Sequence, residues 1–249
     1  MDRLHGHIAV VTGGSTGIGG ATAEMYGQEG AFCHILDHNS EDGEAMAQHI
    51  HQNGGRAAFH KVDVRSADEV SAVFAAIDDQ HHRVDLLVCS AGVLQGAYDD
   101  IADLAEDEWD ATLDTNLKGT YLTTRFAAPL LRRSPRSVLM LISSGAGVRG
   151  ASSSYAYAAS KAGMHGMHYN LDKDLAPTGT RVHVICPGGI NTPLKLHNVG
   201  QGAEFRGEDP QAAISEAREN LGDPRGIARI LTFLASEDGD YVRGTIFTR

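Results

Sequence analysis

The sequence contains few cysteines, and their pattern argues against cross-links and metal clusters. Three cysteines occur in 249 residues, and no pair has a CxxC spacing. We therefore expect neither disulfides nor a zinc site, and we expect Cys33, Cys89 and Cys186 to be reduced and buried in apolar segments. Thirteen histidines are present, but their pairs lack carboxylates or cysteines at ligand spacing, so no metal is expected.

Positive charge and long apolar runs are also scarce. Lysine and arginine number 21 against 32 aspartates and glutamates, which gives a formal net charge of −11. This acidic balance opposes binding to nucleic acid or to an anionic membrane surface. Apolar runs fall short of the roughly 18 residues of a membrane span, and residues 1–7 do not form a secretory signal. We therefore expect a cytoplasmic protein with neither nucleic acid nor membrane as its partner.

Short apolar runs alternate with helical patterns along the whole chain. The expected strands cover residues 8–11, 31–36, 57–62, 84–89, 137–142 and 182–186, with a further strand after residue 243. This alternation is typical of βαβ units. It predicts one α/β domain over residues 1–249, a doubly wound parallel sheet of about seven strands with helices on both faces, the Rossmann architecture.

A glycine-rich turn follows the first expected strand and precedes a helix. Residues 12–19 read TGGSTGIG. Glycines at such a turn let the backbone approach a pyrophosphate that is seated at the positive end of the helix. A glycine turn can also merely connect two elements, so the pattern alone is a modest signal. We expect this turn to bind a dinucleotide through Gly13, Ser15, Thr16, Gly17, Ile18 and Gly19.

An acidic residue ends the second expected strand. Asp37 lies eighteen residues after Gly19. A carboxylate at this place accepts hydrogen bonds from ribose hydroxyls and repels an added 2′-phosphate, which favours NAD over NADP. His38, Asn39 and Thr16 supply no fixed cation for that phosphate. The alternative is a solvated carboxylate, or a cap for the helix that begins near Ser40.

A tyrosine and a lysine are spaced for one helix face. Tyr157 and Lys161 are four residues apart, and Ser144 follows the fifth expected strand. We expect the ammonium to lower the pKa of the phenol so that Tyr157 can exchange a proton with a substrate oxygen. Ser144 would donate a hydrogen bond to the same oxygen. By itself, a tyrosine four residues before a lysine is more often an exposed pair that takes no part in catalysis.

Together these motifs resemble the short-chain dehydrogenase/reductase family over nearly the whole chain. The glycine turn, the Asp-Val pair, the Ala-Gly pair, the asparagine, the Ser-Tyr-Lys set and the Pro-Gly turn occur in the family's order. The resemblance implies Asn116, Ser144, Tyr157 and Lys161 as catalytic residues. It adds to the cofactor-binding set Asp63, Val64, Ser90, Ala91, Gly92, Tyr157, Lys161, Pro187, Gly188, Ile190 and Thr192.

The resemblance also implies a homotetramer or dimer, with the helix of Tyr157 and Lys161 between subunits. His165 and His168 on that helix would then face a partner. Two departures from the family pattern stand out. Ser90 replaces an asparagine that fixes the central strand, so we expect less rigidity there. The family continues past the last strand into an Asp-Gly-Gly turn, so we expect weaker packing around residues 244–249.

Residues 193–224 are rich in glycine and polar residues between flanking prolines. This composition predicts a mobile segment with a short helix near 211–220 that closes over substrate as a lid. An ordinary surface excursion is the alternative. The other expected substrate contacts are mixed in character, which gives a mild preference for a medium-sized, largely apolar alcohol: Leu94, Gln95, Ala146, Val148 and Gly189.

These observations predict an NAD-dependent oxidoreductase that interconverts a secondary alcohol and a ketone. Lys161 would also bind the nicotinamide ribose, and Asn116 would hold a water that links Lys161 to solvent. One alternative is an NADPH-linked 3-oxoacyl carrier protein reductase, which Asp37 disfavours. Another is a dinucleotide-sensing protein without turnover, which the intact Ser144, Tyr157 and Lys161 disfavour.

Overall fold

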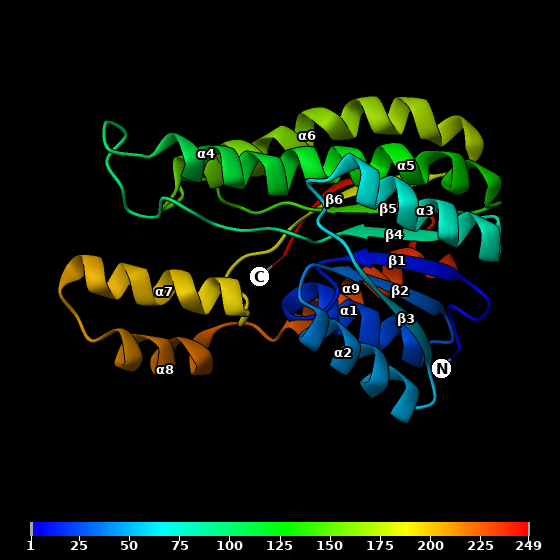
Figure 1. The fold of residues 1–249 in the computed structure, drawn as a ribbon, viewed down its shortest axis with the longest axis horizontal. Coiled ribbons are helices and arrows are strands. Elements are labelled where there is room, and N and C mark those ends of the chain that lie inside the picture. The colour runs from blue at the N-terminus through cyan, green and yellow to red at the C-terminus, as the bar shows by residue number, and fades with distance from the viewer. Residues whose placement is uncertain (1, 249) are drawn as a thin grey trace.

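The structure, a computed structural model that describes residues 2–248, is built on one seven-stranded sheet (Figure 1). The strand order is β3-β2-β1-β4-β5-β6-β7, and every neighbouring pair is parallel. The predicted doubly wound sheet is therefore confirmed. The strands are β1 (Ile8–Thr12), β2 (Phe32–Asp37), β3 (Arg56–Lys61), β4 (Leu86–Cys89), β5 (Val138–Ile142), β6 (Arg181–Cys186) and β7 (Gly244–Phe247).

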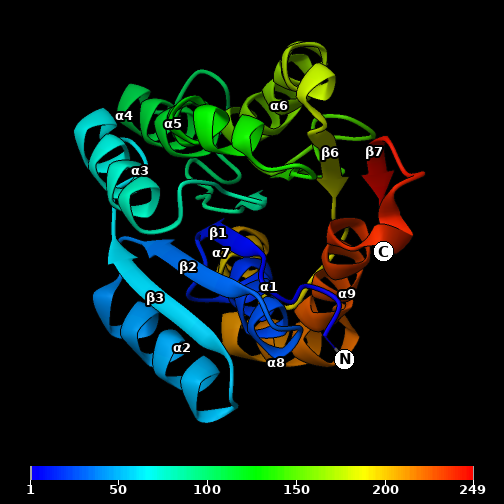
Figure 2. The same cartoon turned by 90° about the vertical axis from the view of Figure 1, so that its right-hand side faces the viewer.

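Helices cover both faces of the sheet, as Figure 2 shows. On one face lie α1 (Gly17–Gln28), α2 (Ser40–Gln52) and α9 (Pro224–Ala235). On the other lie α3 (Ala67–His81), α4 (Glu106–Leu113), α5 (Gly119–Arg133) and α6 (Tyr155–Leu175), with a π-helical turn at Asp114–Lys118 between α4 and α5. No helix among residues 2–248 is both long and apolar enough to span a membrane.

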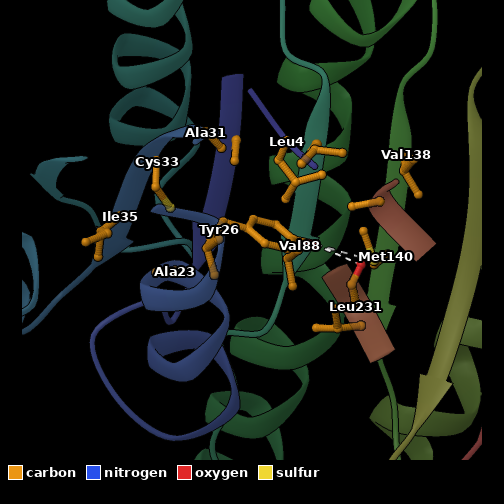
Figure 3. Packing of buried hydrophobic residues seen from close by; sticks show 14 of the residues in the cluster. Leu4, Ala23, Tyr26, Ala31, Cys33, Ile35, Val88, Val138, Met140 and Leu231 are labelled. Carbon is orange, nitrogen blue, oxygen red and sulfur yellow. Dashed lines mark hydrogen bonds between the residues drawn. The ribbon is translucent and has the colours of Figure 1, made fainter. Parts of the chain in front are cut away.

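Each face of the sheet has its own apolar core. β1, β4 and β5 are buried at every position, which explains why they read as continuous apolar runs. Figure 3 shows Tyr26 of α1 pointing into the core beneath α9, beside Val88 and Leu231. The Tyr26 hydroxyl donates to the Leu231 carbonyl oxygen at 3.4 Å and lies 3.8 Å from the sulfur of Met140, so its polar end is satisfied within the core. The three cysteines are free and buried, as predicted.

The segment after β6 is more regular than its composition suggested. Residues 193–224 form α7 (Pro193–Arg206) and α8 (Pro210–Asn220). The helix expected near 211–220 is therefore confirmed as α8, whereas α7 was not expected. Thr192 and Asp209 each cap a helix whose first residue is proline, and Gly207 adopts a φ of +72° at the end of α7. These local signals define both helices despite weak apolar periodicity. Figure 1 places α7 and α8 beyond the carboxyl ends of the strands.

The ends of α3 and of the sheet are fixed by a few specific bonds. Ser66 caps α3 by accepting from the backbone N–H of Glu69, and the Glu69 carboxylate accepts from the backbone N–H of Asp63. At the far edge of the sheet, β7 pairs with β6 over four residues, from His183 with Gly244 to Cys186 with Phe247. Arg181 secures this corner, because its buried guanidinium donates to the carbonyl oxygens of Leu234 and Gly239.

Candidate active site

A cleft of about 1240 Å³ lies at the carboxyl edge of the sheet. Strand order reverses between β1 and β4, and side chains that follow β1 to β6 converge there. Gly19 and Asn116 do not line the cleft. All the other predicted site residues do: Gly13, Ser15, Thr16, Gly17, Ile18, Asp37, Asp63, Val64, Ser90, Ala91, Gly92, Ser144, Tyr157, Lys161, Pro187, Gly188, Ile190 and Thr192.

The glycines of the turn after β1 are required by close backbone approaches. A Cβ on Gly13 would lie 2.7 Å from the Cα of Ala91, and one on Gly19 would lie 2.1 Å from the carbonyl oxygen of Gly13. Gly13 also has a φ of +61°. A side chain at Gly13 would push the turn away from the loop after β4, and one at Gly19 would push α1 away from the turn. Gly19 therefore shapes the turn although it does not line the cleft.

The start of α1 is suited to a phosphate. Thr16 at its N-cap makes no side-chain cap bond, and no acidic residue occurs in the first turn. The hydroxyl of Ser15 is buried, and no residue among 2–248 bonds to it. Free N–H groups and an unsatisfied hydroxyl at a helix N-terminus fit the pyrophosphate of a dinucleotide.

Asp37 is built into the base of the cleft and does not cap a helix. Its carboxylate accepts from the backbone N–H of Ser15 at 3.3 Å and from that of Asn39 at 3.2 Å, and the residue is 9% exposed. Asn39 supplies the cap of α2 through its bond with Asp42. The capping alternative for Asp37 is therefore wrong. The carboxylate stands where it can meet the ribose of a dinucleotide whose phosphates lie on α1.

The side chain of Thr12 bonds to the backbone at Ser90. The hydroxyl of Thr12 accepts from the N–H groups of Ser90 at 3.2 Å and Ala91 at 3.3 Å. The N–H of Ser90 also lies 3.2 Å from the Thr12 carbonyl oxygen. These bonds join the ends of β1 and β4. After β3, the carboxylate of Asp63 accepts two hydrogen bonds from the guanidinium of Arg65, next to Val64.

The three residues of the expected reaction centre meet on one wall of the cleft. Ser144 follows β5, while Tyr157 and Lys161 occupy the first two turns of α6, whose cap is Ser154. The Lys161 nitrogen lies 5.5 Å from the centre of the Tyr157 ring and donates to the carbonyl oxygen of Ile142 at 2.8 Å. Ser144 and Tyr157 are hydrogen-bond partners. The arrangement places two hydroxyl groups and an amine beside one ligand position.

The pKa of Tyr157 moves opposite to expectation. Burial raises this pKa above its ordinary value, and the hydrogen bond with Ser144 only partly offsets the rise. Lys161 does not reverse it, because its nitrogen bonds to Ile142 and is itself desolvated. Burial lowers the pKa of Lys161 to about 8. In the protein alone the phenol therefore holds its proton, and of these two groups the amine titrates nearer to neutral pH.

Asn116 lies behind the cleft and ties together the elements around it. Its side-chain oxygen accepts from the N–H of Val93 at 2.8 Å, and its amide nitrogen donates to the Val93 carbonyl and the Ser160 hydroxyl. Both amide hydrogens are therefore in use. The π-helical turn aims this side chain at the loop after β4 and at α6. Asn116 thus positions the backbone next to Lys161.

Two expectations about neighbouring side chains are wrong. His165 and His168 turn toward the sheet within the same chain: His168 is buried with its Nε2 3.2 Å from the Val182 carbonyl oxygen, and the Nε2 of His165 lies 3.3 Å from the Ser143 hydroxyl. Val148 is 39% exposed and lies outside the cleft. Leu94, Gln95, Ala146 and Gly189 do line it, as expected.

Another part of the cleft lining contains residues that no motif singled out. Loop 93–99, loop 151–153 and α7 meet there, and Gly17 approaches the methyl of Thr192 so closely that α7 starts against the turn. Asn198 of α7 donates to the hydroxyl of Ser153 at 2.9 Å, and the N–H of Tyr98 donates to the Ser153 carbonyl. Only tertiary packing brings these segments together, so local sequence signals could not reveal them.

Comparisons with known proteins match nearly the whole chain. A family model described as short chain dehydrogenase matches residues 7–200. The 3-oxoacyl-(acyl-carrier-protein) reductase FabG of Thermotoga maritima is 31% identical over 98% of this chain and 96% of its own length. A 3beta-hydroxysteroid dehydrogenase of Mediterraneibacter gnavus is 31% identical over 99% and 94%. The crystal structure of levodione reductase superposes with a TM-score of 0.90 at 26% identity, covering 98% of this chain and 96% of that one.

Proposed function

Because the chain belongs to the short-chain dehydrogenase/reductase family of oxidoreductases, which use a nicotinamide dinucleotide, we propose that it interconverts a secondary alcohol and a ketone with NAD. The observation that carries this proposal is the meeting of Ser144, Tyr157 and Lys161 in one cleft with the glycine turn. The nicotinamide, when bound, accepts or supplies the hydride.

The side chains divide the remaining work. Ser144 donates a hydrogen bond to the substrate oxygen and holds the reacting carbon in place. Tyr157 gives its phenolic proton to that oxygen during ketone reduction. For alcohol oxidation, Tyr157 must first lose its proton, and its phenolate then takes the proton from the alcohol. Lys161 exchanges protons near neutral pH because burial lowers its pKa to about 8, and it can restore the proton state of Tyr157. Asn116 keeps the loop after β4 and α6 in register for these steps.

Asp37 supports NAD as the preferred cofactor. Its carboxylate is fixed by two backbone N–H groups, so it cannot turn away from a ribose phosphate. The 3-oxoacyl carrier protein reductase alternative gains no support from the cleft, because its usual cofactor carries that phosphate. The free, buried cysteines suit the reducing cytoplasm, where we propose that the protein acts.

We further propose that α7 and α8 act as a lid and that the protein is a homodimer or homotetramer. α7 contributes Lys195 and Asn198 to the cleft, and its N-cap Thr192 also lines it, so a movement of this helix would open or close the cleft. The exposed Tyr121 and the partly buried Met167 lie in an apolar hollow between the α4–α5 region and α6 that suits a second copy. Sedimentation at micromolar concentration tests the assembly, and a monomer would contradict it.

The reaction is tested with a panel of secondary alcohols and NAD, for which the absorbance of the NADH formed is followed. The matching ketones are tested in the same way by the consumption of NADH. Turnover with NAD that exceeds turnover with NADP supports the proposal. Tight NADH binding without turnover on any alcohol or ketone would favour a dinucleotide sensor instead. The absence of NADH binding would remove both functions.

A further inference from the structure

The substrate half of the cleft has a polar wall. It lies beyond Ser144 and Tyr157 and is formed by the loop after β4, the loop before α6 and the first two turns of α7. The apolar side chains there include Val93, Leu94, Tyr98, Ala151 and Leu194. Polar residues stand among them on all three segments: Gln95, Asp99, Ser152, Ser153, Lys195 and Asn198.

Asn198 is the fixed point of this wall. It is 6% exposed, and its amide nitrogen donates to the Ser153 hydroxyl at 2.9 Å. Its side-chain oxygen has no hydrogen-bond partner among residues 2–248, yet it is not enclosed by the protein. The amide nitrogen of Asn198 is thus held in place, and its oxygen is free to accept a hydrogen bond from a ligand hydroxyl in the cleft.

Three further side chains at the cleft face solvent and make no hydrogen bond or ion pair within residues 2–248. Gln95 and Asp99 are exposed, and Lys195 is partly buried. Asp99 offers only acceptors, Lys195 only donors, and Gln95 both. An apolar substrate packed here would strip water from a carboxylate and an ammonium without replacing their hydrogen bonds, which is costly. A ligand with several hydroxyl groups can satisfy all of them, because each hydroxyl both donates and accepts.

From this wall we infer that the substrate is a small, uncharged compound with several hydroxyl groups, a sugar or polyol, and that Asn198 binds one hydroxyl next to the one that reacts. The inference rests on the proposed function. The wall carries one anion and one cation, Asp99 and Lys195, so it gives no net preference for a charged substrate. The inferred polyhydroxylated substrate replaces the largely apolar alcohol that the sequence mildly favoured.

The test compares xylitol, myo-inositol and D-glucose with cyclohexanol and 2-octanol, using the whole protein and NAD. We expect kcat/KM for at least one polyhydroxylated compound to exceed that for either apolar alcohol by about tenfold or more, the effect of one hydrogen-bonded group. Higher efficiency with the apolar alcohols would overturn the inference and leave the proposed function standing.

A binding measurement keeps the test decisive when turnover is absent. Saturation-transfer NMR with the NADH-bound protein should detect xylitol, inositol or glucose. If NADH binds and none of the three is detected, the inference is wrong. If NADH itself does not bind, the proposed function is wrong as well, so the two failures are distinguishable.

Variants assign the role of Asn198. Asn198→Leu should raise KM for the polyhydroxylated substrate about tenfold, with little change in kcat and in NADH affinity. Ser153→Ala removes the bond within the wall but keeps Asn198, so it should have a smaller effect. Gln201→Leu is the matched control, because Gln201 lies on α7 outside the cleft. An Asn198→Leu variant that behaves like Gln201→Leu would overturn the assignment.

Discussion

The nitrogen of Lys161 lies 5.5 Å from the centre of the Tyr157 ring, one helical turn away on α6. Two residues before Tyr157, the ring of Tyr155 is 48% exposed. The two tyrosines share a helix and a ring type, yet only Tyr157 has both the bond with Ser144 and the neighbouring amine. The chain thus contains its own control for the identity of the proton donor.

Replacing Tyr157 with phenylalanine removes the proton donor and keeps the volume of the ring. We expect kcat to fall by about a hundredfold to ten-thousandfold, as for a lost general acid–base, while NADH affinity changes little. Steady-state kinetics and NADH titration measure the two quantities. Tyr155→Phe should keep most of the activity.

The comparison between these two variants decides the assignment. Equal activity in both would mean that Tyr157 does not exchange the proton. Greater damage from Tyr155→Phe would move the reaction centre toward the mouth of the cleft. Circular dichroism and thermal unfolding of each variant check that a loss of activity is not a loss of fold.

Cofactor preference should depend on Asp37. Asp37→Asn removes the charge but keeps an oxygen that can accept from the N–H of Ser15, so the glycine turn should persist. We expect the ratio of NADPH to NADH dissociation constants to fall by about tenfold, because repulsion of the 2′-phosphate is lost. Fluorescence titration with both cofactors measures this ratio.

A second substitution sharpens the cofactor test. His38 is exposed beside Asp37, and His38→Arg in the Asp37→Asn background should lower the NADPH dissociation constant further. Equal affinities for NADH and NADPH in the unmodified protein would refute the role of Asp37. An unchanged ratio in Asp37→Asn would do the same.

The parts of the site that sequence could predict are those carried by short-range spacing. The glycine turn, Asp37 at a strand end, and Tyr157 four residues before Lys161 each require only local geometry and the parallel sheet. The direction of the Tyr157 pKa could not be predicted, because it depends on how deeply the phenol is buried and on where Lys161 bonds.

The fold was predictable for a similar reason, and the errors in its prediction arise where tertiary packing decides the structure. The buried strands read as apolar runs, whereas α7 lacks a clear apolar stripe and is defined by Thr192 and Pro193 at its start. His165 and His168 were expected to face a partner, but the face of α6 on which they lie packs on β6. Asn198 reaches the cleft only through the packing of α7 on loop 151–153.

A cluster of three histidines beneath α3 should make the protein sensitive to acid. The Nδ1 of His34 in β2 lies 2.8 Å from the Nε2 of His60 in β3, and the His81 ring of α3 meets His34 edge-on at 5.0 Å. His34 is fully buried, and its Nε2 has no partner among the described residues. Burial, with the neighbouring His60 and His81, lowers the pKa of His34 from 6.5 to about 3.

The sign of the pH effect follows from this lowered pKa. The unfolded chain takes up the His34 proton near pH 6.5, whereas the folded protein resists it down to about pH 3. The stability from a neutral His34 is therefore complete above about pH 6.5 and is lost as pH falls below it, by about 1.4 kcal/mol per pH unit. Between pH 6.5 and pH 5 the loss from this residue alone is about 2 kcal/mol.

Burial also lowers the pKa of His81, and the cations Arg83 and Arg56 lower it further, whereas Asp85 raises it. His81 therefore adds to the acid sensitivity. His34→Phe keeps an aromatic ring against Phe32 and removes the titrating group. Urea unfolding at pH 8 and pH 5 should show that the loss of stability on acidification is about 2 kcal/mol smaller in His34→Phe than in the unmodified protein. His197→Phe, at an exposed position of α7, should leave that loss unchanged. The same loss in His34→Phe and the unmodified protein would show that the cluster does not control acid stability, and that other buried histidines such as His183 carry it.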